Sequence, residues 1–317
     1  MQRVLLTGVT GFIGSEIAHK LINDNNYEVV GVVRTSSNKD SLTPIKDIMN
    51  KIAIRQVNLA DYSAVRKFVK DIAPNYIIHV GAITAVRDSF EIPLEYQDVN
   101  YNSTVNLIHS ALDVPDFKKF IFASTMEVYG WQNQRFPFKE DIGLNPGSPY
   151  SASKFAAEQY IRMAGKAYGL PYIVSRACNT FGRKNNAGFI VEYIITKMLK
   201  NETVYIGTPN AVRDMMYVDD HVNAYLTSLK SKVSGEVFNF GTGNQMKMID
   251  LAEKIRQITG SNSQIVPSFP PDYPWRPVVE EYLSLDANKA KQMLGWEPKV
   301  SLEDGLKRTT DFWKMRL

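Results

Sequence analysis

Short apolar runs alternate along the chain with longer segments in which apolar residues recur every three or four positions. The runs are continuous and rich in valine and isoleucine, which is typical of strands buried on both faces of a sheet. They predict strands at residues 4–6, 27–33, 52–57, 76–80, 119–123 and 172–176. The segments between them predict helices at residues 15–25, 63–72, 93–114 and 151–169. This regular alternation predicts an α/β fold with a doubly wound parallel sheet.

The regular alternation of predicted strands and helices ends after residue 176. Asp219 or Asp220 can cap a helix that begins near residue 221. We expect a larger first domain, residues 1–176, and a smaller mixed α/β domain, residues 177–317, with an interdigitated boundary across which part of 204–245 can return to the first domain. In this second part the pattern predicts a polar loop at 179–188, helices at 189–199, 221–229 and 248–259, strands at 204–206 and 236–240, and helical segments from about 286 and 302. One further loop is predicted in the first domain, at 36–50.

Composition narrows the class of protein. The 317 residues are 44% hydrophobic, enough for a large core, and the net charge of +4 comes from scattered basic residues rather than a basic run. No nucleic-acid partner is therefore expected. The single cysteine, Cys178, excludes an internal disulfide. No apolar run approaches the roughly 18 residues of a membrane span, and no basic and apolar leader opens the chain. We expect a soluble cytoplasmic protein with no membrane partner and no metal site.

Three glycines stand between the first strand and the first helix. Gly8, Gly11 and Gly14 have the spacing G-x-x-G-x-x-G, which differs from the commoner G-x-G-x-x-G. Glycines allow a pyrophosphate to approach the backbone, and a helix N-terminus supplies free N–H groups, as in Rossmann-type dinucleotide sites. The alternative is a turn that binds nothing. We assign the cofactor phosphates to Gly8, Gly11, Phe12, Ile13 and Gly14.

Arg34 ends the second strand, twenty residues beyond Gly14. An acidic residue at this position binds the ribose of NAD, whereas an arginine suits the 2′-phosphate of NADP. We therefore predict NADP, with NAD as the alternative. If Arg34 contacts no cofactor, it is a solvated arginine at the end of a strand. Ligands of open α/β sheets bind at the carboxyl ends of the strands. The remaining cofactor contacts are assigned to such positions: Asn58, Leu59, Val80, Gly81, Ala82 and Ser124.

Tyr150 and Lys154 are four residues apart on a predicted helix, so both side chains lie on one face. An ammonium beside a phenol favours the phenolate and lowers its pKa, which makes the tyrosine a candidate base. The same spacing recurs at Tyr193 and Lys197, where we interpret it as a solvated helix face. Tyr150 differs because it follows a strand whose carboxyl end carries Thr125, a hydroxyl that can share its proton.

With these motifs, the sequence resembles the extended branch of the short-chain dehydrogenase/reductase superfamily, the nucleotide-sugar epimerases and dehydratases. The resemblance covers almost the whole chain, and the glycine spacing is this family's variant. It rests on residues 7–14, Asp61, 79–82, 124–130, Tyr150 with Lys154, 176–182, 213–220, 238–243, 276–277 and 294–296.

The resemblance implies a role for each candidate residue. Tyr150 would be the catalytic base, Lys154 would tune it and hold the nicotinamide ribose, and Thr125 would be the hydroxyl partner. A nucleotide-diphosphate sugar would be the substrate, met by Asn179, Arg213 and Arg276. Family members commonly dimerise through the helices at 93–114 and 151–169, so a homodimer is expected.

The reaction itself depends on Glu127, two residues beyond Thr125. The family's first step is oxidation at sugar C4, and a Thr-x-Glu pattern is that of the 4,6-dehydratases, where the carboxylate removes the C5 proton. Residues 33–38 and 89–91 also look like those of NADP-dependent GDP-mannose 4,6-dehydratases. Met126 argues against a dehydratase, because dehydratases often have aspartate or serine at this position. If Glu127 has no catalytic role, it is an acid that binds neighbouring backbone or a loop partner.

We therefore predict an NAD(P)-dependent nucleotide-sugar 4,6-dehydratase. The alternatives are a UDP-sugar 4-epimerase, then a decarboxylase or reductase of the same family. A cofactor-binding regulator without catalysis is a remote alternative, which the intact set of Thr125, Tyr150 and Lys154 opposes.

Overall fold

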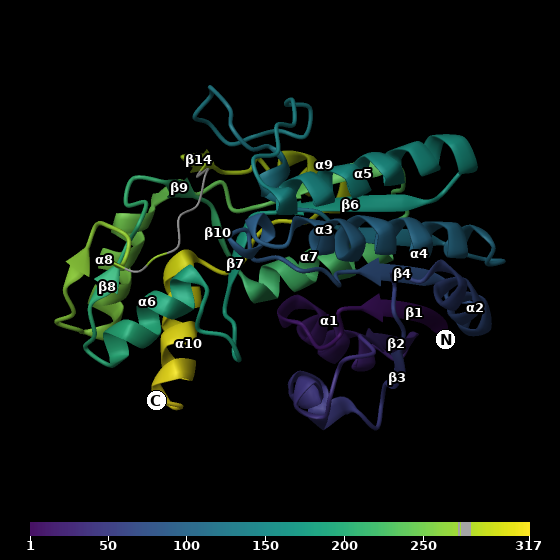
Figure 1. Ribbon diagram of the computed structural model, residues 1–317, viewed down its shortest axis with the longest axis horizontal. Coiled ribbons are helices and arrows are strands. Elements are labelled where there is room, and N and C mark those ends of the chain that lie inside the picture. The colour runs from purple at the N-terminus through teal and green to yellow at the C-terminus, as the bar shows by residue number, and fades with distance from the viewer. Residues whose placement is uncertain (272, 274–279) are drawn as a thin grey trace.

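The computed structural model describes residues 1–271, 273 and 280–317. Its centre is a seven-stranded sheet in which every neighbouring pair is parallel (Figure 1). In spatial order the strands are β11 (Glu236–Phe240), β6 (Tyr172–Ala177), β5 (Lys119–Ala123), β4 (Tyr76–His79), β1 (Gln2–Thr7), β2 (Tyr27–Val33) and β3 (Ala53–Gln56). This confirms the predicted doubly wound parallel sheet. The chain leaves β1 toward β2 and later returns on its other side as β4, which places the topological switch, and the expected ligand crevice, between β1 and β4.

Helices cover both faces of this sheet, and successive strand residues supply the two cores. Leu5 packs toward α2 (Tyr62–Ile72), α4 (Ser103–Leu112) and α5 (Pro149–Tyr168). Val4 and Leu6 pack toward α1 (Phe12–Ile22) and α7 (Val218–Lys230). This alternation explains why the strand sequences are apolar throughout, since neither face meets water.

The second part of the chain adds small sheets and a helical cluster at the left of Figure 1. Its apolar core joins α6, α8 and α10. The strands pair as β7 with β10, β8 with β13, and β9 between β12 and β14. Their bounds are β7 (Asn179–Phe181), β8 (Val204–Tyr205), β9 (Val212–Arg213), β10 (Met215–Tyr217), β12 (Met246–Lys247), β13 (Ile265–Val266) and β14 (Tyr282–Leu283). The helices are α6 (Ile190–Leu199), α8 (Met248–Thr259), α9 (Asn288–Leu294) and α10 (Leu302–Lys314).

Three local predictions were wrong. The predicted loop at 36–50 contains a 3-10 helix (Asp40–Ile48), which buries Ile45 and Ile48 against α1. The predicted helix at 93–114 is interrupted by a π segment (Gln97–Asn102) between α3 (Pro93–Tyr96) and α4, and the predicted loop at 179–188 begins with β7. In each case tertiary contacts override the local pattern.

The expected helix cap at Asp219 or Asp220 was also wrong. Helix α7 begins at Val218 and is preceded by Tyr217 with no side-chain cap, so both aspartates lie inside its first turn. The Asp220 carboxylate instead accepts the backbone N–H groups of Lys299 and Val300, at 3.0 and 2.9 Å. It therefore joins α7 to the segment that precedes α10.

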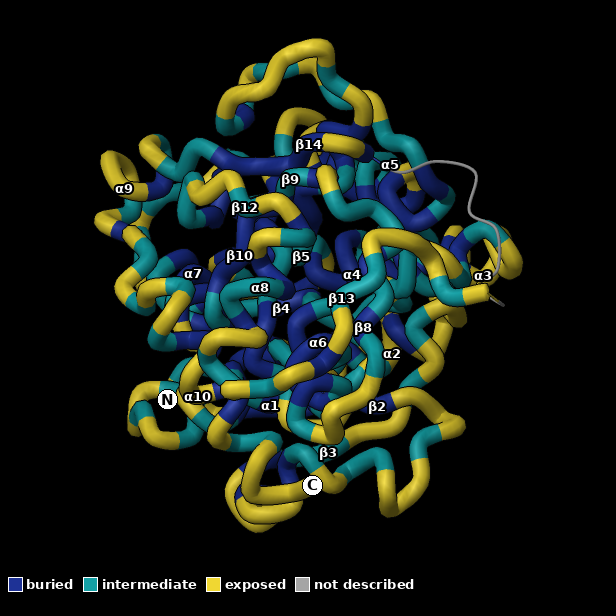
Figure 2. The backbone as a smooth tube through the Cα atoms, turned by 90° about the vertical axis from the view of Figure 1, so that its left-hand side faces the viewer, coloured by how far each residue is buried: buried dark blue, intermediate teal, exposed yellow. Residues whose placement is uncertain are grey.

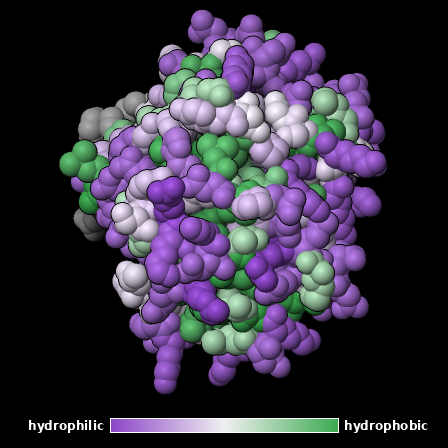
Figure 3. Space-filling model, turned by 90° about the vertical axis from the view of Figure 1, so that its right-hand side faces the viewer, coloured by the Kyte–Doolittle hydropathy of each residue, from purple (hydrophilic) through white to green (hydrophobic). Residues whose placement is uncertain are grey.

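The distribution of buried and of hydrophilic residues can be followed in two views of the molecule. In Figure 2 the buried residues lie toward the centre of the molecule and the exposed residues lie around its edge. Hydrophilic side chains cover most of the opposite face, with hydrophobic ones in narrow strips between them (Figure 3). No helix within the described ranges combines the length and the apolar character needed to cross a bilayer.

Candidate active site

The glycine loop leaves no room for a side chain at Gly8 or Gly14. A Cβ on Gly14 would lie 2.0 Å from the carbonyl oxygen of Gly8, and one on Gly8 would lie 2.7 Å from the Cα of Gly81. Gly8 also has a φ of +69°, in the left-handed region that favours glycine. Helix α1 starts at Phe12 behind Gly11, and no side chain caps it. Its first N–H groups therefore face a backbone-lined cradle, which suits a pyrophosphate.

A chain of buried hydrogen bonds fixes the neighbouring end of β4. The Nδ1 of His79 lies 2.6 Å from the Thr7 hydroxyl and its Nε2 lies 3.1 Å from the Thr104 hydroxyl. Burial lowers the pKa of His79 to about 3, so the ring is neutral. The Thr7 oxygen also accepts the N–H of Gly81 at 3.0 Å. His79 is thus a structural histidine that sets the position of Val80, Gly81 and Ala82, which are half-buried at the switch point.

The remaining cofactor candidates lie at the carboxyl ends of β2 and β3. Arg34 is exposed, and its guanidinium hydrogen-bonds to none of the residues that the structure describes. Asn58 is exposed and bonds its own turn, accepting the N–H of Ala60 at 3.1 Å. Leu59 packs into the core beside α2, and its carbonyl accepts from Asn106 at 2.9 Å. Of these three, Arg34 has the side chain most available to a ligand.

Tyr150 and Lys154 are held by the start of α5. Ser148 and Ser151 form a reciprocal capping box, which places Tyr150 in the first turn. Both the phenol and the ammonium are buried, and Thr125 hydrogen-bonds to the Tyr150 side chain. Lys154 donates from Nζ to the carbonyl of Ala123, at 2.6 Å. The end of β5 and the first turns of α5 therefore bring the three predicted residues together.

The pKa of Tyr150 shifts opposite to the direction expected from the sequence. Burial raises it, the charge of Glu127 raises it further, and only the Thr125 bond lowers it. Burial also lowers the pKa of Lys154 to about 7. The reason is the loss of water around both groups, since burial disfavours the charged form of each. The Ala123 carbonyl and the Phe122 ring, 4.5 Å away, favour the ammonium but do not offset this cost.

Glu127 belongs to the same cluster. It lies in a short 3-10 helix (Met126–Val128) that Thr125 caps, with the Thr125 hydroxyl accepting the Glu127 N–H at 3.2 Å. Its carboxylate is close enough to the Tyr150 phenol for the charge to act on it. Met126 points elsewhere, because its buried side chain belongs to the core around Phe238 and Phe240.

A buried ion pair supports this cluster, and the sequence reasoning missed it. Glu158 and Arg176 are each at most 1% exposed and are joined by two hydrogen bonds. Ser124 donates to the same carboxylate at 3.1 Å, and Arg176 donates to the Tyr129 hydroxyl at 2.9 Å. A signal was available, since Glu158 lies four residues beyond Lys154 on α5. Ser124 thus lies against this ion pair.

Asn179 and Arg213 line a separate cavity of about 440 Å³ between α6, β8 and α8. The Oδ1 of Asn179 is buried and has no hydrogen-bond partner within the described ranges. Aromatic side chains that the sequence reasoning missed form much of the wall: Tyr193, Tyr205, Phe269 and Tyr273. Phe269 and Tyr273 stack with ring centroids 4.6 Å apart. Arg276, the third predicted substrate contact, lies outside the described residues.

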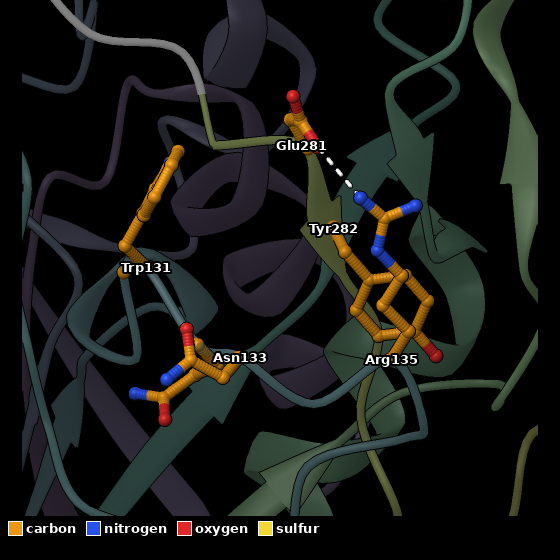
Figure 4. A pocket seen from close by; sticks show the side chains of 7 residues that line it. Trp131, Asn133, Arg135, Glu281 and Tyr282 are labelled. Atoms are coloured by element: carbon orange, nitrogen blue, oxygen red, sulfur yellow. Dashed lines mark hydrogen bonds and ion pairs between the residues drawn. The ribbon is translucent and has the colours of Figure 1, made fainter.

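A smaller pocket of about 180 Å³ is lined in part by residues that follow the Glu127 segment in the chain, from Gly130 to Arg135 (Figure 4). Trp131 forms one side, and the ion pair between Arg135 and Glu281, 2.7 Å long, forms the other. None of the predicted catalytic or binding residues lines it. In the part of the chain that the structure describes, no three potential metal ligands gather either.

Comparison with known proteins identifies the family. A putative UDP-glucose 4-epimerase from Methanocaldococcus jannaschii is 34% identical over 319 residues, which cover 98% of each chain. The structure of UDP-glucose 4-epimerase from Thermotoga maritima with UDP-glucose matches with a TM-score of 0.90, at 32% identity over 99% of each chain. A dTDP-glucose 4,6-dehydratase from Bacillus anthracis, solved with NAD, matches with a TM-score of 0.86, at 26% identity over 99% of this chain and 97% of the other.

The family described as GDP-mannose 4,6 dehydratase matches residues 5–309. The match spans the glycine loop, the Tyr150 cluster and the second part of the chain. It confirms the resemblance seen in the sequence: the chain belongs to the GDP-mannose 4,6 dehydratase family, among the nucleotide-sugar epimerases and dehydratases.

Proposed function

We propose that this protein is an NADP-dependent nucleotide-sugar 4,6-dehydratase. The observation that carries the proposal is the position of Glu127, whose carboxylate acts on the buried phenol of Tyr150. Oxidation at C4 needs one base, whereas dehydration needs a second group that can take the C5 proton. A carboxylate beside the Thr125 and Tyr150 hydroxyls supplies that second group.

The proposed first step uses Tyr150 and Lys154. Tyr150 takes the proton of the C4 hydroxyl, with Thr125 bonded to the phenol. When bound, the cofactor would accept the hydride from C4 and return it to C6 after water has left. As the hydride returns, C5 would take up the proton that Tyr150 removed from the C4 hydroxyl, so that the site is restored. Since burial and the charge of Glu127 both hold the pKa of Tyr150 high, proton transfer requires positive charge nearby. Lys154 supplies it in its protonated form and holds the nicotinamide ribose.

The proposed second step belongs to Glu127. The C4 ketone acidifies the proton on C5, and the Glu127 carboxylate removes it. The C6 hydroxyl then leaves as water, taking up one proton. Met126 cannot donate this proton, because its thioether carries none and is buried in the core. We therefore assign to Glu127 both the removal of the C5 proton and its delivery to the leaving hydroxyl.

We propose that residues 1–176 hold NADP and that residues 177–317 hold most of the substrate. The cofactor would lie on Gly8, Gly11, Phe12, Ile13 and Gly14, with its 2′-phosphate at Arg34. The remaining proposed cofactor contacts are Asn58, Leu59, Val80, Gly81, Ala82 and Ser124. The nucleotide diphosphate of the substrate would lie in the aromatic cavity, with Asn179, Arg213 and Arg276. The unpartnered Oδ1 of Asn179 supports this assignment, since it can accept a hydrogen bond from a ligand.

Arg34 is the basis for proposing NADP rather than NAD. Replacing Arg34 by alanine should weaken NADP about 10- to 100-fold, as expected for loss of a charged hydrogen bond, and leave NAD nearly unchanged. Arg66→Ala, an exposed arginine on α2 paired with Asp113, is the control. Equal weakening of both cofactors, measured by titration calorimetry, would refute the 2′-phosphate contact.

A UDP-sugar 4-epimerase is the second candidate. The two epimerases named above favour it, as does the absence of an acid at Met126. An epimerase would return the hydride to the other face of the C4 ketone, and Glu127 would then have no step to perform. A decarboxylase of UDP-glucuronate would also use the Thr-x-Glu pattern.

One experiment separates these reactions. The purified protein with NADP or NAD is incubated with GDP-, UDP-, dTDP- and CDP-hexoses, and with UDP-glucuronate, and the products are analysed by mass spectrometry. A product lighter by one water supports the dehydratase. An isomer of unchanged mass establishes the epimerase instead, and loss of carbon dioxide establishes the decarboxylase.

We also propose a cytoplasmic homodimer that joins through α4 and α5. Ala152 is exposed and Ala156 is half-buried, so both are available to a partner, whereas Ala157 is buried in the protein's own core. Met163 and Tyr168 are exposed apolar side chains on α5. Light scattering during gel filtration tests the dimer, and Met163→Glu should shift it to the monomer.

A further inference from the structure

Arg183 extends from the second part of the chain onto the glycine loop. Its guanidinium carbon lies 3.6 Å from the ring centroid of Phe189 and 4.5 Å from that of Phe12. Phe12 is the first residue of α1, whose free N–H groups line the phosphate cradle. The two rings hold the planar guanidinium in place. A positive charge from the second part of the chain thus lies beside the first residue of α1.

The donors of this guanidinium are mostly unused. Nη1 donates to the carbonyl of Thr180 at 2.5 Å, and the nearest carboxylate oxygen, from Glu192, is 3.8 Å away. The other oxygen of Glu192 accepts the backbone N–H groups of Gly182 and Arg183, each at 2.8 Å. Across residues 1–271, 273 and 280–317, Nε and Nη2 of Arg183 have no hydrogen-bond partner. The side chain is only 15% exposed, so a cation with free donors is kept largely out of water.

A second buried group beside Arg183 also lacks a partner. His221, on α7, is 8% exposed, and its Nδ1 lies 2.8 Å from the Thr180 hydroxyl. Its Nε2 is buried and bonds to no described residue. The charge of Arg183 acts on this ring, which shows that the two are close. Thr180 therefore bonds to both Arg183, through its carbonyl, and His221, through its hydroxyl. The remaining polar atoms of these two side chains are available to a ligand.

The neighbouring residue attaches the same loop to α1. Lys184 forms an ion pair with Glu16, in the second turn of α1, at 2.5 Å. Arg183 and Lys184 together hold the segment after β7 against the first two turns of α1. Lys184 is exposed, however, so its ion pair should contribute little to stability. It serves as the matched control for Arg183.

We propose that Arg183 binds the diphosphate of the dinucleotide cofactor, closing over the glycine cradle from the second part of the chain. This inference rests on the proposed function, since it takes NADP or NAD as the ligand. The glycine loop offers N–H groups from one side only, and a guanidinium matches two phosphate oxygens at once. An anion at this place would also compensate the buried charge of Arg183. Cofactor binding would then require both parts of the chain.

The diphosphate is common to both cofactors, which gives the inference a distinct signature. Arg183→Gln should weaken NADP, NAD and ADP-ribose by the same factor, about 10- to 100-fold for a lost charged hydrogen bond. ADP-ribose carries the diphosphate without nicotinamide. Arg34→Ala, by contrast, should weaken NADP alone. Arg183→Lys keeps the charge without the planar fork, and its loss should be intermediate.

The affinities are measured by titration calorimetry on the full chain, so no catalytic activity is needed. Circular dichroism and urea unfolding without cofactor check that each variant is folded. Lys184→Gln should change each affinity less than about threefold, as expected for an exposed ion pair.

The possible failures are distinguishable. If Lys184→Gln weakens binding as much as Arg183→Gln, the loop position matters and not the guanidinium, and the inference is wrong. It is also wrong if Arg183→Gln weakens NADP and NAD but leaves ADP-ribose unchanged, because the contact then lies at the nicotinamide. Should the unaltered protein bind none of the three ligands, the proposed function itself fails.

Discussion

The site chemistry at the residue scale is governed by burial. Tyr150 and Lys154 carry no charge-stabilising partner strong enough to offset the loss of water, so the pKa of the phenol rises and that of the ammonium falls. Buried titratable groups in a cleft with shifted pKa values are typical of functional sites. His79 also has a shifted pKa, but we do not count it as a functional residue, because both its ring nitrogens already have partners inside the protein.

Glu127 is the residue on which the proposed reaction depends. Glu127→Gln should reduce water loss from the sugar at least about 100-fold, the scale of a lost acid–base group, while C4 oxidation remains detectable as reduced cofactor. Mass spectrometry and nicotinamide absorbance measure the two steps separately. Glu91→Gln, at an exposed position, is the control. Dehydration that survives the Glu127 change would remove this residue from the mechanism.

Lys154 predicts a pH dependence of stability in the cofactor-free protein. Its folded pKa of about 7 lies below its usual value of 10.5, so between these values the unfolded chain binds more protons. The free energy of unfolding should therefore rise with pH above about 7, and the full penalty should be present below it. Lys154→Met should reduce this slope.

The slope should not vanish, because burial also lowers the pKa of Lys119, to about 8, and this residue remains. Urea unfolding at several pH values between about 7 and 9.5 measures the difference. Identical slopes in the two proteins would show that Lys154 is not buried as a charged group.

Helix α5 organises the site at the element scale. Tyr150, Lys154 and Glu158 recur every four residues, so one helix face carries the phenol, the ammonium and the buried carboxylate. Glu158 is bonded both to Arg176 on β6 and to Ser124 after β5. The helix is thereby joined to the two strands whose ends form the site.

Breaking this ion pair should destabilise the whole domain. Glu158→Gln leaves the Arg176 guanidinium buried without a counter-charge, which typically costs about 3–5 kcal/mol. Asp71→Asn removes an exposed ion pair on α2 and should cost no more than about 1 kcal/mol. Urea unfolding at neutral pH compares them. A Glu158 variant as stable as the Asp71 variant would show that the buried pair contributes specificity rather than stability.

The whole molecule places the glycine loop at the switch between β1 and β4 and brings the second part of the chain against it. Strand β11 joins the large sheet beside β6 although it follows about 60 residues of the second part. The two parts therefore share one sheet, and a ligand between them should stabilise them together.

NADP should raise the stability of the whole chain. At a free concentration 100 times its Kd, binding to the folded state alone adds about 2.7 kcal/mol to the free energy of unfolding. NAD at the same concentration should add less if Arg34 selects the 2′-phosphate. Thermal unfolding followed by tryptophan fluorescence measures both, and an unchanged midpoint with NADP would contradict the proposed cofactor.

The sequence by itself determined the α/β class, six strands of the sheet, the glycine loop and the family. These follow from local patterns, namely apolar periodicity, glycine spacing and short motifs, each of which depends on neighbouring residues. It also identified Thr125, Glu127, Tyr150 and Lys154 as a candidate set. The spacing of four gave Tyr150 and Lys154, the end of a predicted strand gave Thr125, and the resemblance to Thr-x-Glu dehydratases gave Glu127. It did not predict the 3-10 helix at 40–48 or the π segment, since tertiary contacts stabilise both.

Only the tertiary structure decided which side chains meet. The pairing of Glu158 with Arg176, the aromatic wall around Asn179, and the position of Arg183 on Phe12 join residues far apart in the chain. The direction of the pKa shifts also came from the structure, since desolvation depends on how much of the fold surrounds a group. Local sequence patterns do not predict these surroundings, because burial is a property of the packed molecule.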